Sequence, residues 1–167
     1  MTTKIIINKE KFNKLKQALL EASGACLKVG FFDGQKAKNS KLTLATIAKI
    51  NEYGNKKIPS RPFMRQALIK NNNFKSQLED AFKNIINLKM GFRPALRKVG
   101  VFAMQEMQKQ FTDGNFKENS KRTINKKRSS RPLIDKGQLR RSVSWRVENW
   151  ELSNLKNLLL LVPLVIL

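Results

Sequence analysis

The chain has 167 residues and a net charge of +22 at pH 7, because it carries 34 lysine and arginine residues against 12 acidic ones. The length suits one domain with one hydrophobic core, and the charge excess favours binding to polyanions or to an acidic protein surface. The single cysteine excludes an internal disulfide, and an N-terminal apolar run of three isoleucines is too short for a secretory signal. We therefore expect cytoplasmic synthesis without export.

The first part of the chain predicts two strands with a helix between them. Residues 4–8 are compatible with a short strand, and Asn8 can cap a helix that ends near Gly24. The apolar face of that helix consists of Phe12, Leu15, Ala18, Leu19 and Ala22. Residues 25–32 alternate with the period of a strand and lead into an Asp-Gly turn.

The next region predicts a short helix followed by a rigid connection. Thr43 can cap the helix, and Gly54 can end it. Its apolar positions are Leu44, Ile47, Ala48 and Tyr53. Pro59 and Pro62 then fix two φ angles and favour extended geometry in the residues before them. We expect a stiff elbow at this point, which we call the proline elbow (residues 55–63).

Two further helical stretches follow the proline elbow. Residues 63–88 carry an apolar stripe with helical spacing, although three consecutive asparagines at residues 71–73 weaken its middle. This pattern predicts one kinked helix or two separate ones. Pro94 suits the first turn of another helix, which Asp113 and Gly114 would close.

The last part of the domain predicts a long polar loop and a second strand. Residues 117–131 are almost wholly polar and lack periodicity, and we expect residues 112–136 to form a loop that is mobile in the isolated subunit. Residues 142–147 alternate with the period of a strand, which needs a partner for its backbone groups and has a natural one in residues 25–32. The sequence thus predicts a single α+β domain over residues 1–149, with a small sheet, packed helices and a long polar loop before the last strand.

Residues 150–167 differ from what precedes them. The run from residue 158 to 167 is apolar apart from an interruption at Pro163, and it is shorter than the roughly 20 residues of a membrane-spanning helix. We therefore expect no membrane anchor. Two interpretations stay open: an apolar end that docks on the domain or on a partner, and a sequence altered by a reading-frame change.

The sequence offers no set of side chains for catalysis. The absence of histidine removes the commonest general base and the main zinc ligand besides cysteine. Asp33 and Asp135 each precede a glycine by one or two residues, a context typical of carboxylates that bond to turn backbone. Cys26 lies in an apolar predicted strand, where a small buried side chain is the ordinary role. We expect no enzyme activity, no cofactor and no metal site.

The most basic region spans residues 116–146, with eleven basic residues and two acidic ones. This density favours contact with a polyanion, but the charges of residues 117–131 are not interleaved with aromatic side chains, as a base-stacking surface requires. Solvated surface charge is the plain alternative. The candidate polyanion contacts are Lys121, Arg122, Lys126, Lys127, Arg128 and Arg131.

Five segments in this order resemble the neck and tail-completion family of long-tailed DNA phages, often described as virion morphogenesis or minor tail proteins. They are Val-Gly-Phe-Phe-Asp-Gly (29–34), Thr-Ile-Ala-Lys-Ile-Asn-Glu-Tyr-Gly (46–54), Ile-Pro-Ser-Arg-Pro-Phe-Met-Arg (58–65), Ser-Lys-Arg-Thr-Ile-Asn-Lys-Lys (120–127) and Arg-Pro-Leu-Ile-Asp-Lys-Gly-Gln-Leu-Arg-Arg-Ser-Val (131–143). The family usually has Thr-Gly where this chain has Lys136 and Gly137, and its members end shortly after the final strand, which leaves the tail from Trp150 unaccounted for.

The resemblance implies a small connector-like subunit of a homo-oligomeric ring at the head–tail junction or the tail end of a phage or prophage particle. Such a subunit would be assembled in the bacterial cytoplasm, become part of the virion, and bind other neck or tail proteins with at most weak, non-specific contact to DNA. The positions that the resemblance marks as structural or interface residues are Arg61, Pro62, Phe63, Leu133, Asp135 and Gly137. The alternative from another class is a non-specific nucleic-acid-binding protein that neutralises phosphates with its positive charge.

Overall fold

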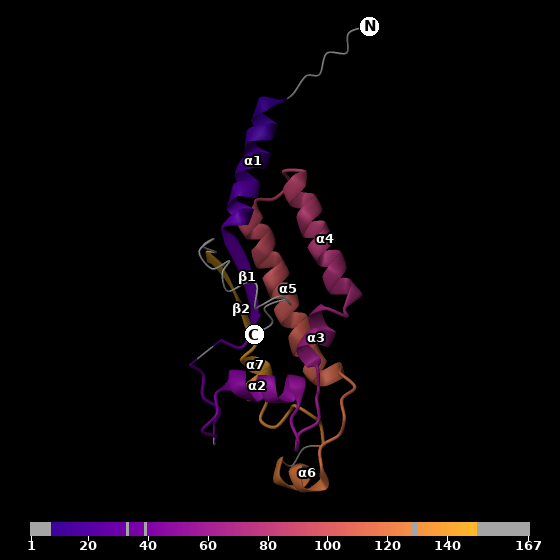
Figure 1. Ribbon diagram of the computed structural model, residues 1–167. Helices are drawn as coiled ribbons and strands as arrows, with labels where there is room; N and C mark the ends of the chain where they lie inside the picture. The colour runs from indigo at the N-terminus through magenta and orange to yellow at the C-terminus, as the bar shows by residue number, and fades with distance from the viewer. Residues whose placement is uncertain (1–7, 33, 39, 128–129, 150–167) are drawn as a thin grey trace.

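The long helix α5 (Phe92–Asp113) is the element around which the other elements pack in the computed structural model (Figure 1). The structure describes residues 8–32, 34–38, 40–127 and 130–149. The other elements, in chain order, are α1 (Lys9–Ser23), β1 (Ala25–Gly30), α2 (Leu44–Tyr53), α3 (Phe63–Leu68), α4 (Asn72–Ile86), α6 (Lys121–Lys127), α7 (Gln138–Arg141) and β2 (Ser144–Asn149). This arrangement confirms the predicted α+β fold.

The two strands pair in one sheet, as predicted, and the structure shows that they run antiparallel, with Ala25 opposite Asn149 and Gly30 opposite Ser144. Their apolar side chains lie on the face toward α5. At Gly100 of that helix, a Cβ atom would lie 2.7 Å from the ring of Trp145, so glycine permits close contact between helix and sheet. The predicted strand at residues 4–8 falls mostly outside the described residues.

The opposite face of the sheet is polar. Lys28 Nζ lies 2.6 Å from a carboxylate oxygen of Glu148, and Arg146 pairs with the same carboxylate. The Arg146 guanidinium also lies 4.0 Å from the centroid of the Phe32 ring. One covered face and one polar face give the alternation that the sequence predicted.

Helix caps account for most of the element boundaries. Asn8 accepts a hydrogen bond from Lys11 N at 3.0 Å, and Thr43 accepts one from Thr46 N at 3.1 Å. Asn71 accepts bonds from the backbone N–H groups of Asn73 and Phe74. Because Asn71 caps a new helix, the stretch predicted as one kinked helix or two is divided into α3 and α4.

The main core is built around Phe63, whose side chain has no exposed area. Its ring lies 6.0 Å from that of Phe31 and 4.7 Å from that of Phe111. Leu133 and Leu139 belong to the same buried cluster, so the segment after α6 packs against the proline elbow and α5. A second, smaller cluster lies where α1, α4 and the beginning of α5 meet.

The expectation of a loop without regular structure over residues 117–131 is wrong for part of this stretch, because α6 forms within it. Ser120 begins the helix, with its hydroxyl accepting a hydrogen bond from Thr123 N at 3.3 Å. None of the residues of α6 is fully buried. No periodic pattern in the sequence predicts this helix, since it has no apolar stripe and its beginning depends on a single capping serine.

Three apolar helical positions also differ from the prediction. Tyr53, expected on the buried side of α2, is 60% exposed, and the guanidinium of Arg65 lies 5.3 Å from its ring centroid. On α1, Ala18 and Ala22 pack on the second cluster as expected, whereas Phe12 and Leu19 are each 59% exposed. The small residues of α1 allow the close approach to its neighbours, and the large ones remain outside the contact.

Candidate functional site

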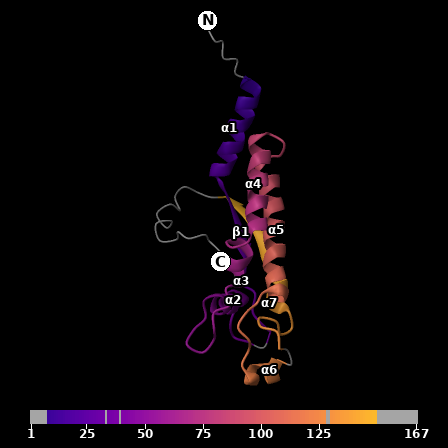
Figure 2. The same ribbon diagram turned by 90° about the vertical axis from the view of Figure 1, so that its right-hand side faces the viewer.

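The proline elbow folds back against the end of α2 at the end of the molecule opposite α1 (Figures 1 and 2). Gly54, with φ of +75°, reverses the chain, and a Cβ atom there would lie 2.7 Å from Ser60 N. Ser60 Oγ donates to the carbonyl of Glu52 at 2.7 Å, and Arg61 N donates to the carbonyl of Asn51 at the same distance. Backbone geometry and hydrogen bonds together make the connection rigid, as the prolines predicted.

Glu52 is the buried charge that fixes α3 against α2. Its side chain is 1% exposed, and it accepts hydrogen bonds from Met64 N at 2.9 Å, Arg65 N at 3.2 Å and Arg65 Nε at 2.9 Å. The first two donors are backbone N–H groups in the first turn of α3, which a helix cannot satisfy by itself. A carboxylate from one helix thus caps the next one.

Arg61 connects the proline elbow to the beginning of the basic region. The residue is 5% exposed; its Nε donates to the carbonyl of Lys117 at 2.9 Å, and its Nη2 donates to the carbonyl of Glu118 at 3.2 Å and to Asn119 Oδ1 at 3.1 Å. Burial lowers the pKa of the guanidinium, which nonetheless stays charged at neutral pH. Neutral oxygens on three consecutive residues therefore solvate a buried cation, and the bonds hold residues 117–119 in place. We call this set of contacts the Arg61 clamp.

Burial decides between the structural and interface roles that the resemblance left open for the elbow. The side chains of Arg61 and Phe63 lie inside the subunit, so they are structural and are not available to a partner in this conformation. Pro62 is half-buried. An interface at the proline elbow would instead use the exposed lysines at positions 56 and 57 and the exposed ring of Tyr53.

The second predicted group, Leu133, Asp135 and Gly137, forms the turn between α6 and α7. Leu133 is 9% exposed and has a positive φ of +62°, so its side chain enters the core from a strained backbone position. Gly137, with φ of +69°, precedes α7. Of the three, only Asp135 is exposed. Leu133 brings this turn into the same core cluster as Phe63 of the proline elbow.

The candidate polyanion contacts of residues 121–131 differ in their exposure: four are exposed and one is half-buried. Lys121, Arg122, Lys126 and Arg131 are exposed, and no ion pair of the described residues involves them. Lys127 is half-buried; burial lowers the pKa of its ammonium group, with the charge of Asp135 acting in the opposite direction. Lys127 is thus a poorer polyanion contact than the sequence predicted. Arg128 lies outside the described residues.

Glu52 and Asn119 contribute to the site but were not predicted from the sequence. A signal for Glu52 was present, because Leu44, Ala48 and Glu52 are spaced four residues apart and all three are buried on the same side of α2. An acid that continues an apolar stripe indicates a buried carboxylate that needs a partner. Asn119 has no such signal, since its partner Arg61 is 58 residues away in the chain.

The described residues contain no group of three or more acidic or cysteine side chains that could hold a metal ion, and within them no helix is long and apolar enough to cross a membrane. Cys26 is half-buried, where the sequence predicted a buried side chain, and burial raises the pKa of its thiol. A raised thiol pKa lowers the thiolate fraction and with it the reactivity. The contacts of the site thus form a rigid surface with exposed charge.

The arrangement of the site thus has three parts: a rigid elbow, a buried arginine that clamps the following segment, and a short helix with three exposed basic side chains. Searches of known protein families, of curated proteins and of solved structures each found no significant match to this chain.

Proposed function

We propose that the protein is a subunit of a phage or prophage neck or tail-completion ring and acts in virion assembly rather than as an enzyme. One observation carries the proposal beyond the sequence resemblance. Four of the resembling segments, at residues 46–54, 58–65, 120–127 and 131–143, meet at one end of the molecule around the Arg61 clamp and the Phe63 core. Segments far apart in the chain thus lie together at one end of the molecule (Figure 1), an arrangement that suits a contact with another protein.

The surface combines a rigid base with exposed charge. The Glu52 cap and the Arg61 clamp fix the backbone of the proline elbow, so little conformational entropy is lost when a partner binds there. The exposed bases of α6 add a salt-sensitive attraction to an acidic neighbour or to DNA that passes through a ring. Specificity then comes from shape, and the rate of association from charge.

The test is virion assembly in cells that produce the particle. Deletion of the gene should give heads without tails or tails of aberrant length by electron microscopy, and normal infectious particles from the deletion would contradict the proposal. In the triple variant Lys121→Gln, Arg122→Gln, Lys126→Gln, assembly should weaken most at low salt, because high salt already screens the lost attraction.

The matched control removes the same charge elsewhere. Lys75, Lys83 and Lys89 are exposed on or just after α4, a helix that lies apart from α6 in Figure 1. Their replacement by glutamine should leave assembly unchanged. An equal defect in both triple variants would mean that total charge, and not the α6 surface, governs assembly.

Non-specific nucleic-acid binding is the second candidate, favoured by the four exposed and unpaired bases in and after α6. Binding to a DNA duplex at several salt concentrations separates the two functions. For a genuine binder, log K should fall steeply with log[salt], and the α6 triple variant should reduce that slope by up to about 3. A ring subunit should bind duplex weakly at physiological salt while it associates with itself or with tail proteins.

A further inference from the structure

The sheet has an open edge along β2. A strand with one antiparallel partner directs the N–H and C=O groups of alternate residues away from that partner. Within the part of the chain that the structure describes, β2 pairs with β1 alone, and no further backbone hydrogen bond reaches its residues. In Figure 1, β2 is the strand of the sheet that lies farther from α4. A row of unpaired backbone groups is a template for another strand.

The side chains along this edge are only partly covered. Trp145 and Val147 face α5 but are half-buried, whereas Val29 of β1 is buried. On the polar face of the sheet, the side chain of Arg146 is 53% exposed and that of Glu148 is 32% exposed. A strand added beside β2 would therefore cover apolar area on one face and meet a charge of each sign on the other.

These charges match those of a second β2 in one register. When two copies of the strand run antiparallel with Val147 opposite its equivalent, Arg146 of each copy lies opposite Glu148 of the other, and opposite charges in such pairs stabilise a sheet. A register centred on Arg146 would instead place two arginines opposite one another, which destabilises it. A slip by one residue would place polar side chains opposite apolar ones. The charge pattern thus selects a single register.

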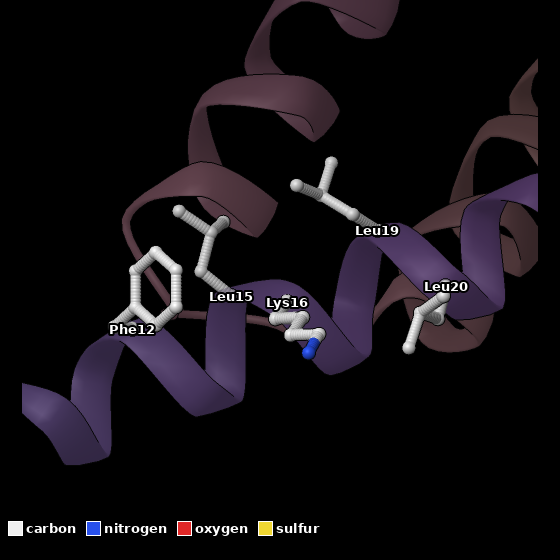
Figure 3. A pocket seen from close by; sticks show the side chains of 5 residues that line it. All are labelled: Phe12, Leu15, Lys16, Leu19 and Leu20. Atoms are coloured by element: carbon white, nitrogen blue, oxygen red, sulfur yellow. The ribbon is translucent and has the colours of Figure 1, made fainter.

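Two other exposed surfaces lack this match. The polar face of β1 carries one charge, Lys28, so two β1 edges would bring like charges close together. On α1, Phe12 and Leu19 extend the apolar face on which Ala18 packs, and they border a shallow hollow that Lys16 also lines (Figure 3). Lys16 is at the middle of α1, so it would meet its equivalent in parallel or antiparallel packing of two such helices.

The spacing of the elements leaves room for two copies. Helix α5 lies over both strands, because a Cβ atom at Gly100 would be 2.7 Å from the ring of Trp145 and 3.0 Å from the side chain of Leu27. Strands in a sheet are about 4.8 Å apart, so the centres of two β1–β2 pairs joined through β2 are about 10 Å apart. Packed helices have axes about 8–10 Å apart. The two α5 helices would thus lie side by side on one face of the joined sheet.

We propose that two copies of this chain associate through the outer edge of β2 and form a four-stranded antiparallel sheet in the order β1–β2–β2–β1. The net charge of +22 opposes association, but physiological salt screens charges that are more than about 8 Å apart. The contact is isologous and closes at two copies, so a ring needs a further surface. The inference is independent of the proposed virion role, since it depends on β2 and α5.

The test is sedimentation equilibrium of the full chain at physiological salt. The unchanged protein should form a dimer. Arg146→Glu and Glu148→Arg should each weaken the dimer about tenfold or more, because both cross-strand pairs then join like charges. An equal mixture of the two variants should recover the affinity, since each cross-strand pair of a mixed dimer again joins opposite charges.

Matched controls make the same charge changes on α4. Lys75→Glu and Glu79→Arg lie at exposed positions of that helix. Alone or mixed, they should dimerise as the unchanged protein does.

Disulfide formation tests the register separately. The background is Cys26→Ser, because Cys26 lies opposite Glu148 within the sheet and could pair with a thiol there. A mixture of Arg146→Cys and Glu148→Cys should give a disulfide-linked dimer on oxidation. Each variant alone should give several-fold less, because equivalent positions are then diagonal and too far apart for a disulfide.

Each result decides the proposal. Loss of affinity in both charge variants, recovery in their mixture and a link between positions 146 and 148 support it. A monomer at all concentrations, equal weakening by the edge and control variants, no recovery in the mixture, or a link from position 146 to its equivalent would overturn it. If circular dichroism shows that a charge variant does not fold, the disulfide result decides alone.

Discussion

The two ends of α5 are completed in opposite ways. At its C-terminal end, the proline elbow, the Arg61 clamp and the Phe63 core bury a carboxylate, a guanidinium and three aromatic rings in one cluster. At its N-terminal end, α1 contacts the rest of the domain mainly through small side chains and leaves Phe12 and Leu19 exposed. One end of the helix is thus fixed by large buried groups, whereas the other is packed through small side chains and leaves large apolar ones in solvent.

The largest expected effect tests the rigid end. Replacement of Phe63 by alanine removes the central ring of the core and should lower the free energy of unfolding by about 3–5 kcal/mol. Phe82→Ala on α4, where the ring is 57% exposed, is the control and should change it by about 0.5 kcal/mol or less. Urea unfolding of both variants measures the difference, and similar losses would contradict the central place of Phe63.

The buried carboxylate gives the next effect. Glu52→Gln keeps an oxygen for the N-terminus of α3 but loses the charge that attracts Arg65, so the free energy of unfolding should fall by about 1–3 kcal/mol. Glu79→Gln, at an exposed position of α4, removes the same charge without a buried contact. If the two variants were equally stable in urea, Glu52 would contribute to stability only by lowering the net positive charge of the protein, and not through its buried contacts.

The third prediction concerns the effect of the Arg61 clamp on the local stability of residues 117–127. Lysine at position 61 keeps the charge, but its ammonium group lacks the planar set of donors of a guanidinium and cannot bond to all three neighbouring oxygens. Residues 117–127 should therefore open more often. A local loss of about 1–2 kcal/mol corresponds to roughly 5–30-fold faster cleavage by trypsin within residues 121–127. Arg97→Lys, exposed on α5, is the control. Unchanged cleavage in Arg61→Lys would show that residues 117–127 are mobile in spite of the clamp, as the sequence predicted.

The smallest effect concerns the polar face of the sheet. The hydrogen bond and charge of Lys28 hold the pKa of Glu148 below its usual range. A depressed carboxyl pKa contributes stability above the unfolded pKa, and that stability is lost as the pH falls through the folded value. The difference in unfolding free energy between the unchanged protein and Glu148→Gln should therefore be present at about pH 7 and vanish toward about pH 3. A difference that persists in acid would contradict this pairing.

Sequence reasoning succeeded where the determinants are local. The caps Asn8 and Thr43, the glycine that ends α2, and the alternation of the two strands all act within a few residues, and each was predicted. The α+β fold follows from these elements because two matching strands need one another's backbone groups.

The tertiary structure alone decided which charged and aromatic residues are internal. Arg61 and Phe63 belong to a segment that the sequence marks by its prolines, but their burial depends on residues 117–119 and on α5, about 50 residues further along the chain. The formation of α6 and the exposure of Phe12 and Leu19 on α1 likewise depend on which side chains pack nearby. The sequence alone determines local backbone preferences and the spacing of apolar residues. The burial of a side chain depends on residues that are distant in the chain and come together only when it folds.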